Sequence, residues 1–416
     1  MKAARPLPLL AVAIGLALGS AVSLGLARFA YAMLLPPMRA DLGWSYFTAG
    51  AMNTVNAVGY LVGALAAPAC VRRWGAGPCL LAGNVATGLT IAACGLVLDD
   101  LSLYALRCLT GAVSAVAFVA GGVLAARLAG RPDRGTGTPG KSSSGLVLGI
   151  YYGGTGLGVI AASLLVPAAA ARSVAHAWQA AWIELGAIGV AAALITAFVT
   201  TERRGGPAGG ASPAPSTTAA PPSGDPAAAS ARFHWRPFLP GLAAYFLFGL
   251  GYIGYITFIV TLLREQRLSM AAVAWFYGLL GAAITVSPWL WAGLLQRRRG
   301  GEPATLLNGL LALATLLAVA SASPAAVFGS GLLFGAVLLS TVASTTALVR
   351  HNLPAAAWPA GIGAFTIVFA AGQIVGPSLV GLVADHGGGL AAGLACSAAT
   401  LALASAMASR QKPLPR

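Results

Sequence analysis

The sequence predicts an all-α polytopic membrane protein with twelve transmembrane helices, arranged as two pseudo-symmetric six-helix bundles. Three observations lead to this fold class. The 416 residues are 58% apolar and only 8% charged, the uncharged runs are long enough to cross a bilayer, and a polar segment divides these runs into two sets of six. In a soluble domain, about a quarter of the residues are usually charged. The small number of charges here is therefore typical of a chain surrounded mostly by lipid.

The composition also argues against several classes of function. The net charge is +15, but the basic residues fall in short clusters between long uncharged runs, so we do not expect nucleic acid as a partner. The cysteines lie in apolar runs without a C-x-x-C pair, which is typical of small buried hydrophobes and predicts no metal, redox site or cofactor. They are Cys70, Cys79, Cys94, Cys108 and Cys396.

A membrane-spanning helix needs about 20 mostly apolar residues. The first uncharged run, 6–27, exceeds the core of a signal peptide and is interpreted as a retained span. The run 303–349 is long enough for two spans, and Pro324 marks the break after Ser321 because proline ends helices. The remaining expected spans are 42–71, 74–98, 108–126, 142–171, 179–200, 237–263, 268–296, 351–384 and 386–409.

The basic residues predict how the chain lies in the membrane. With a cytoplasmic N-terminus, nineteen of the twenty-five lysines and arginines fall in cytoplasmic segments. The outer loops then hold only Arg39, Arg172, Arg264 and Arg267. This bias obeys the positive-inside rule, so we expect both termini in the cytoplasm.

The chain divides into two halves. Residues 205–230 are nearly all Gly, Pro, Ala, Ser and Thr, which is typical of a flexible linker. We expect an N-terminal bundle over 1–200, a cytoplasmic linker over 201–236 and a C-terminal bundle over 237–416. Two motif pairs share an offset of 224 residues, Gly25 to Tyr31 with Gly249 to Tyr255, and Gly111 to Val113 with Gly335 to Val337. A third pair aligns Gly154 to Gly158 with Gly372 to Gly376. Six spans per half make a parallel repeat.

Local motifs resemble those of the major facilitator superfamily. Its Gly-x-Leu-Ala-Asp-Arg-x-Gly signature corresponds to Pro68-Ala-Cys-Val-Arg72-Arg73-Trp-Gly75, and again to Gly293-Leu-Leu-Gln-Arg297-Arg298-Arg-Gly300. Both copies carry Arg where the superfamily has Asp. The stretch from Gly25 to Met38, the segment Phe248-Gly-Leu-Gly-Tyr252 and the segment Gly372-Gln-Ile-Val-Gly-Pro377 resemble the YbfB/YjiJ-type branch. The resemblance implies the major facilitator fold, solute transport, and a gating role for Arg72, Arg73, Arg297 and Arg298.

Three charged residues fall inside the expected spans: Arg28 in the first, Arg107 in the fourth and Glu184 in the sixth. A charge mid-helix costs about 2.5–3.5 kcal/mol, so such residues usually face a cavity or a partner. With the first span ending at Pro36, all three lie at a similar outer depth. We therefore expect Arg28 or Arg107 within ion-pair reach of Glu184. Either the cluster only neutralises itself, or one arginine binds an anionic solute while Glu184 carries a proton.

Aromatic residues on the seventh span form a second candidate. Tyr245, Phe248, Tyr252 and Tyr255 share one helical face, which suits either packing or a binding wall. Gln373, Asn53 and Asn56 are polar at membrane depth and need partners, for which interhelical hydrogen bonds are the simpler explanation. The candidate substrate-binding residues are Arg28, Tyr31, Arg107, Tyr252, Tyr255 and Gln373.

The function these features favour is secondary transport of a small organic solute by alternating access. A proton-coupled organic anion is the specific hypothesis. A drug or metabolite efflux pump, or a transporter-like receptor that moves nothing, is the alternative. Only one acidic residue lies deep in a span, which argues against an intramembrane enzyme. We expect a monomer in the bacterial cytoplasmic membrane, with solute, lipid and protons as partners.

Overall fold

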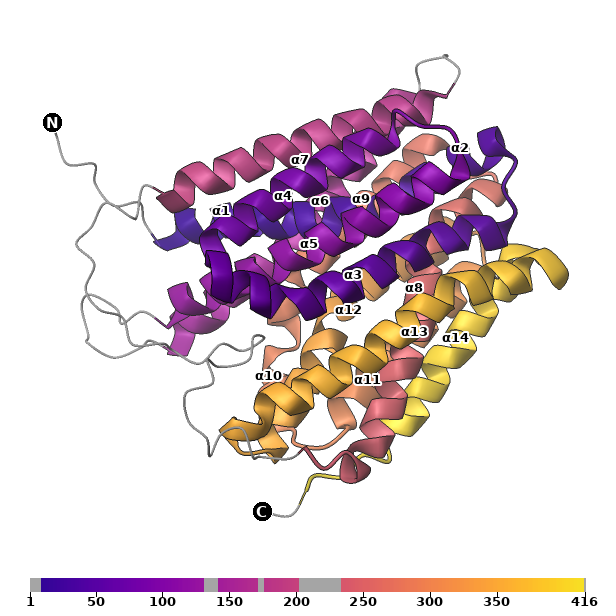
Figure 1. The fold of residues 1–416 in the computed structure, drawn as a ribbon. Helices are drawn as coiled ribbons and strands as arrows, with labels where there is room; N and C mark the ends of the chain where they lie inside the picture. Colours follow the sequence, from indigo (N-terminus) through magenta and orange to yellow (C-terminus); the bar gives the residue numbers. More distant parts are fainter. Residues whose placement is uncertain (1–8, 131–140, 171–175, 202–232, 415–416) are drawn as a thin grey trace, which may run out of the picture.

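The computed structural model describes residues 9–130, 141–170, 176–201 and 233–414, which form helices and the turns between them. Within these residues, twelve helical segments are long and apolar enough to cross a membrane. Figure 1 shows them as one elongated bundle. The first span of the first half runs from Leu9 to Leu42 and consists of α1 (Leu9–Ser20), the π-helix η1 (Ala21–Phe29) and α2 (Tyr31–Leu42). The other five spans of this half are α3 (Tyr46–Trp74), α4 (Ala76–Cys94), α5 (Asp100–Ala129), α6 (Lys141–Ala170) and α7 (Ala177–Thr201).

The second half begins with a short 3-10 turn, η4 (Arg236–Phe238). It continues with α8 (Leu239–Glu265), α9 (Met270–Leu290), α10 (Ala292–Arg297), α11 (Glu302–Ala320), α12 (Pro324–Asn352), η5 (Ala355–Ala357), α13 (Trp358–His386) and α14 (Gly389–Ala408). The expected break inside 303–349 is confirmed, because α11 ends at Ala320 and α12 starts at Pro324. Most of the expected linker, residues 202–232, lies outside the described residues.

Because the number of spans is even, α1 begins and α14 ends at the same end of the bundle (Figure 1). We call this end the termini face. The opposite end, which carries the turns at 43–45, 95–99, 266–269, 321–323 and 387–388, is called the distal face. These two names are structural and do not by themselves assign a side of the membrane.

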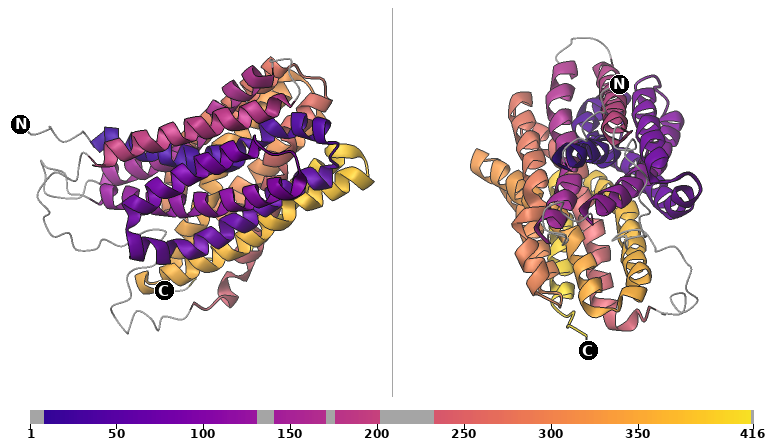
Figure 2. Two further views of the ribbon diagram at one scale, coloured as in Figure 1. Left: turned by 45° about the horizontal axis from the view of Figure 1, so that its top comes forward. Right: turned by 90° about the vertical axis from the view of Figure 1, so that its left-hand side faces the viewer.

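Corresponding helices pack in the same way in the two halves. In the first half α3 packs on α5 and α4 on α7, and in the second half α9 packs on α12 and α11 on α14. The seams between the halves also correspond, because α3 packs on α13 where α9 packs on α6. Figure 2 shows the indigo-to-magenta and orange-to-yellow helices gathered on opposite sides. Two parallel repeats related by a two-fold axis produce this pattern, in which each helix contact of one half has a counterpart in the other half.

The helix caps at the distal face repeat the 224-residue offset. The side chains of Ser45 and Ser269 accept hydrogen bonds from the third residue of α3 and of α9. Asp99 and Ser323 do the same for α5 and α12. Each pair is separated by 224 positions, and each cap satisfies an N–H group that the first turn of a helix leaves unpaired.

Close helix packing repeats at the same offset. A Cβ at Gly111 would clash with the carbonyl oxygen of Asn56, and a Cβ at Gly335 would clash with that of Leu280. Both the glycines and the carbonyls are 224 positions apart. The third motif pair was aligned wrongly, by one helical turn. Gly158 packs on Gly25 as Gly372 packs on Gly249, so the partner of Gly372 is Gly158 rather than Gly154.

Glycines also line both seams between the halves. On the α3–α13 seam a Cβ at Gly50 would clash with the Pro377 carbonyl. On the α6–α9 seam Gly156 lies against the backbone of Gly281, and Gly153 against Thr285. Small residues let helix backbones approach closely in membranes, so the backbones of the two halves come close together at these points.

The first span differs from the expected one in two ways. We expected it to end near Pro36, but α2 continues to Leu42 with Pro36 and Pro37 inside it. Proline is tolerated inside transmembrane helices because neighbouring groups satisfy the freed backbone atoms. The middle of the span is π-helical, and the Ala30 N–H donates to the Gly25 carbonyl five residues earlier. Such segments are rare and often lie at functional sites.

Candidate functional site

Four polar residues meet near the middle of the bundle. Arg28 comes from η1, Tyr60 from α3, Tyr252 from α8 and Gln373 from α13, so both halves contribute. Each residue lies within about three positions of the centre of its span. The equal outer depth expected for Arg28, Arg107 and Glu184 was therefore wrong, because it assumed that the first span ends at Pro36. Transporters of this architecture bind solutes near the bilayer midplane.

Arg28 is the central cation of this group. Its side chain is 3% exposed, and its guanidinium carbon lies 5.7 Å from the centre of the Tyr60 ring. It also interacts electrostatically with the hydroxyls of Tyr60 and Tyr252. Within the described residues, its Nε and Nη2 atoms have no hydrogen-bond partner. These two atoms form one edge of the planar guanidinium, and that edge fits the two oxygens of a carboxylate.

The Tyr252 hydroxyl accepts a hydrogen bond from the Gln373 side-chain amide. Both residues are buried. Because that bond uses a lone pair of the phenol oxygen, the hydroxyl proton of Tyr252 remains available to a third group. The expected pairing of Gln373 with another helix is thus found, and it orients Tyr252 beside Arg28.

The aromatic wall on α8 is partly as expected. Tyr245, Phe248 and Tyr252 stack in a row, and all three stack on Phe369 of α13 at centroid distances of 4.6 to 5.6 Å. Tyr255 does not belong to this row. Its ring stacks on Phe334 at 3.9 Å, and its hydroxyl is 2.7 Å from the Ser330 hydroxyl. Tyr255 therefore faces α12 and packs within the second half.

Arg107, like Arg28, has Nε and Nη2 atoms without a hydrogen-bond partner among the described residues, but it lies away from the centre of its span and has other contacts. It is 1% exposed, and its Nη1 donates a 2.8 Å hydrogen bond to the Ala27 carbonyl. Its guanidinium lies 5.1 Å from the Tyr31 ring centre and 5.4 Å from that of Trp182. The Tyr31 hydroxyl donates to the Ala49 carbonyl. Arg107 and Tyr31 thus hold the first span in place from inside the N-terminal half.

A second side chain binds the same part of the first span from the other half. The Tyr277 hydroxyl of α9 donates to the Phe29 carbonyl at 2.5 Å. The carbonyls of Ala27 and Phe29 flank Arg28, where η1 ends and α2 begins. Helix ends leave carbonyls in need of donors, and here Arg107 and Tyr277 supply them. The backbone that carries Arg28 is therefore fixed from both halves.

The ion pair expected between Glu184 and Arg28 or Arg107 is not formed. Among the described residues, the one ion pair joins His176 and Asp41. Glu184 is half-buried on α7 and contacts other groups. Matching depth along the helices was a poor guide, because depth does not fix which way each side chain points around its helix axis.

The arginines of the two signature segments end the second and eighth spans. Arg72 and Arg73 close α3, and Arg297 and Arg298 follow at the end of α10. All four are exposed at the termini face. In the described parts of the chain no acidic side chain forms an ion pair with them. Their gating role therefore stays a prediction.

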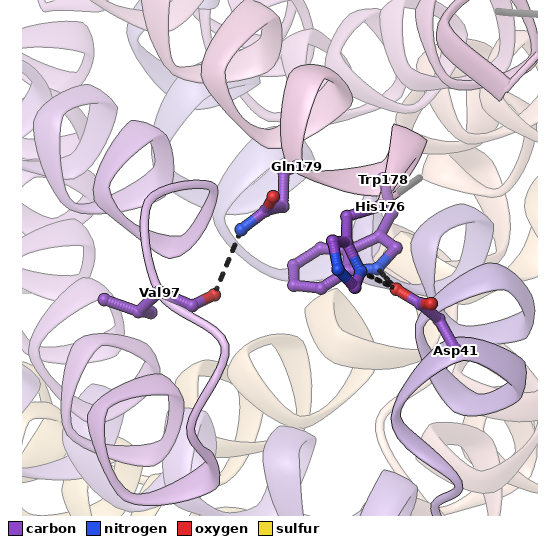
Figure 3. Close-up of polar contacts among 5 residues, drawn as sticks. All are labelled: Asp41, Val97, His176, Trp178 and Gln179. Atoms are coloured by element: carbon purple, nitrogen blue, oxygen red, sulfur yellow. Dashed lines mark hydrogen bonds and ion pairs between the residues drawn. The ribbon is translucent and has the colours of Figure 1, made fainter. Parts of the chain in front are cut away.

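Further polar contacts lie at the distal face of the N-terminal half. The Asp41 carboxylate accepts hydrogen bonds from the rings of His176 and Trp178, and the Gln179 amide donates to the Val97 carbonyl (Figure 3). These contacts join α2 and the 95–99 turn to the start of α7. They lie within one half and do not reach the other.

Sequence reasoning missed Tyr60, Tyr277 and Phe369. Tyr60 lies four positions after Asn56 on the same face of α3, and Phe369 lies four before Gln373 on α13. This spacing places each beside a residue that was singled out. Asn53 itself donates to Thr257 of α8 at 2.7 Å, and Asn56 donates to the Arg107 carbonyl at 3.0 Å.

Comparison with known proteins shows which families and structures this chain resembles. A family model described as "Uncharacterised MFS-type transporter YbfB" matches residues 20–409. No curated protein matches the sequence. A structure of a variant of the nucleoside transporter NupG is similar at 11% identity and a TM-score of 0.69, covering 96% of this chain and 98% of that one.

A bacterial homolog of the human lysosomal transporter Spinster, in an inward-facing and unoccupied conformation, is similar at 15% identity and a TM-score of 0.69. The match covers 96% of this chain and 95% of that one. Identities this low establish the fold alone, whereas the family model covers nearly the whole chain. The chain therefore belongs to the YbfB-type family of major facilitator transporters.

Proposed function

We propose that this transporter carries a small organic anion, and that Arg28 binds its carboxylate. The observation that carries the proposal is the unpartnered Nε and Nη2 edge of a buried guanidinium at the centre of the bundle. A buried cation without a hydrogen-bonded counter-ion is costly in a low-dielectric interior. An anionic ligand that binds this edge bidentately offsets that cost.

The surroundings of Arg28 support the same class of solute. Tyr252 offers a hydroxyl proton beside the guanidinium, and the row of Tyr245, Phe248, Tyr252 and Phe369 offers an apolar surface. We infer that the carboxylate contacts Arg28 and Tyr252 while an apolar body contacts the aromatic row. Because Arg28, Tyr252 and Gln373 are all buried, solute enters only when the halves separate, as alternating access requires.

We further propose that the termini face is cytoplasmic and that a proton gradient drives the transport. The distribution of lysine and arginine supports the first statement. Glu184, the one acidic residue within the described middle of a span, supports the second. Linker residues 201–236 then join two bundles, 1–200 and 237–416, on the cytoplasmic side.

Uptake by purified protein in lipid vesicles tests the proposal. Vesicles are given radiolabelled aromatic and aliphatic acids, and matched amines, with and without a pH gradient. We expect uptake of acids and none of amines, and abolition of acid uptake by Arg28→Ala. Uptake of amines alone contradicts the anion assignment and favours an efflux pump for cations. Saturable binding without uptake in any direction favours a receptor.

The proton role of Glu184 has its own test in the same vesicles. Glu184→Gln keeps the size of the side chain and removes its charge. We expect acid uptake to lose its dependence on the pH gradient while the solute still binds. Gradient-driven uptake at the normal rate contradicts the role of Glu184 and leaves the anion assignment unchanged.

A further inference from the structure

Hydrogen bonds between the two halves gather toward the distal face. The Tyr46 hydroxyl at the start of α3 donates to the Glu265 carboxylate at the end of α8. The Asp385 carboxylate near the end of α13 accepts the backbone N–H groups of Tyr46 and Phe47 at 2.9 and 2.8 Å. We call Tyr46, Glu265 and Asp385 the distal lock. Deeper contacts follow from Thr54 to Ser378 and from Asn53 to Thr257.

The charge of each carboxylate strengthens its bond in the distal lock. Asp385 binds the first two N–H groups of α3, where a helix has unpaired donors and a partial positive charge. Protonating Asp385 weakens its two acceptor bonds and places a new O–H beside two N–H donors. Protonating Glu265 removes the charge that strengthens its bond with the Tyr46 hydroxyl. Both changes act only across the seam between the halves.

The surroundings of the distal lock allow such a response. Asp385 and Glu265 are exposed, so both exchange protons with the solution at the distal face. The Arg39 guanidinium lies 3.7 Å from the Tyr46 ring centre and interacts with its hydroxyl. The other titratable or charged side chains at the distal ends of the elements around the distal lock are Asp41, Asp99, Asp100, Tyr104, Arg264, Arg267 and His386.

We propose that Asp385 and Glu265 bind protons from the distal side and that protonation opens the distal face. This inference rests on the proposed proton-driven transport, and it adds a proton site distinct from Glu184. Asp385 and Glu265 affect the balance between the conformations with a closed and an open distal face. Their contacts join α3 to α13 and to α8, and they do not reach the central residues around Arg28. Acid on the distal side therefore exposes Arg28 to the solution that supplies both solute and protons.

A distance measurement tests the proposal without transport or solute. Spin labels are attached to ketone-bearing amino acids at Leu98 and Ala322, which are exposed in distal turns of opposite halves. This attachment leaves the native cysteines in place. Distances between the labels are measured in lipid at pH 7.5 and pH 3.5, because exposed carboxyls are largely protonated only below about pH 4. We expect acid to raise the population with a long distance about tenfold, as the loss of a charge-assisted hydrogen bond predicts.

Two variants and a control complete the experiment. Asp385→Asn combined with Glu265→Gln is expected to show the long distance already at pH 7.5 and to respond little to acid. Tyr46→Phe, which removes one of the three bonds, is expected to give an intermediate population. Asp41→Asn removes an exposed distal carboxylate whose partners lie in one half, and it is expected to behave like the unmodified protein.

Two outcomes overturn the proposal. One is an unchanged short distance in the double variant at both pH values. The other is a full acid response in the double variant, which assigns the response to other groups. The readout is independent of the organic anion, so failure here leaves the role of Arg28 untouched. Conversely, failure of acid uptake in vesicles leaves the distance experiment fully interpretable.

Discussion

The two halves share a backbone arrangement but not a polar chemistry. Caps at Ser45 and Ser269, and close contacts at Gly111 and Gly335, recur at one offset of 224 residues. At that same offset Arg28 corresponds to Tyr252. The first half thus brings a buried cation to the centre, and the second half brings a phenol and stacked rings.

Tyr31 and Tyr255 show the same division. Each lies against the fourth span of its own half, where Tyr31 meets Arg107 and Tyr255 meets Phe334. The repeat therefore retains contacts that depend on helix geometry, such as caps and glycine approaches. It differs in the side chains that a solute meets. A site built at the boundary of unlike halves can bind an asymmetric solute, one end charged and the other apolar.

Exchanging Arg28 and Tyr252, the corresponding central residues of the two halves, is expected to have the largest effect on solute binding. Arg28→Tyr is expected to raise the KM for an organic acid about hundredfold, because two charge-assisted hydrogen bonds are lost. The double variant Arg28→Tyr with Tyr252→Arg is expected to recover part of this loss if the positions are equivalent about a two-fold axis. Vesicle uptake kinetics measure both. A KM in the double variant that is no lower than that of Arg28→Tyr alone contradicts the equivalence.

The shared backbone contacts should respond equally in the two halves. Gly111→Leu and Gly335→Leu each force a side chain against a carbonyl and are expected to destabilise the fold by about 1–3 kcal/mol. Gly329→Leu is the matched control on α12, where a Cβ has open space. Thermal unfolding of purified protein in detergent measures all three. A large effect at only one of the two glycines would show that the repeat is not retained in packing.

Two tyrosines one turn apart should separate binding from packing. Tyr252→Phe is expected to raise the KM about fivefold, since about 1 kcal/mol of hydrogen bonding to the solute is lost. Tyr255→Phe is expected to leave the KM unchanged and to lower the unfolding temperature, because its hydroxyl bonds to Ser330. Uptake kinetics and thermal unfolding on the same preparations measure the pair. Equal KM values for the two variants contradict the assignment of Tyr252 to the site.

The smallest difference expected is between the equivalent caps Asp99 and Ser323. The backbone N–H of Ser102 holds the pKa of Asp99 below its ordinary value. A carboxyl whose pKa is lower in the folded state contributes stability above its ordinary pKa, and this contribution is lost as pH falls through the folded value. Asp99→Ala is therefore expected to destabilise at neutral pH and less in acid, whereas Ser323→Ala has the same effect throughout. Unfolding temperatures at pH 7 and pH 3.5 measure the contrast.

Most of the fold was predictable from the sequence because lipid imposes strong constraints. Uncharged runs must be helices long enough to span, and Pro324 with its cap at Ser323 marked the break between α11 and α12. The repeat was also predictable, since the offset linking Arg28 to Tyr252 recurs in the caps. The π-helix around Arg28 was not predictable, because no residue pattern signals hydrogen bonds that skip an extra position.

The candidate site was predictable in three of its four polar members, with Tyr60 missed, but not in its arrangement. Arg28, Tyr252 and Gln373 were identified as polar or aromatic groups at membrane depth, and the structure brings them together. The pairing of Glu184 with an arginine was wrong, because only packing decides the direction of a side chain around its helix. Tyr255 was misplaced for a related reason. It shares a helical face with Tyr252, but α12 rather than α13 lies opposite its ring.

The glycine contacts on both seams have a mechanical consequence. Helices that interlock through ridges and grooves must lift over rows of side chains in order to shift. At Gly50 against Pro377 and at Gly156 against Gly281, the nearest facing atom is a backbone carbonyl oxygen. Contacts of this kind present few side-chain ridges that must be lifted over one another during a small sliding displacement. If the halves rock as we propose, the polar bonds at the distal end are the contacts between α3, α8 and α13 that this motion must break.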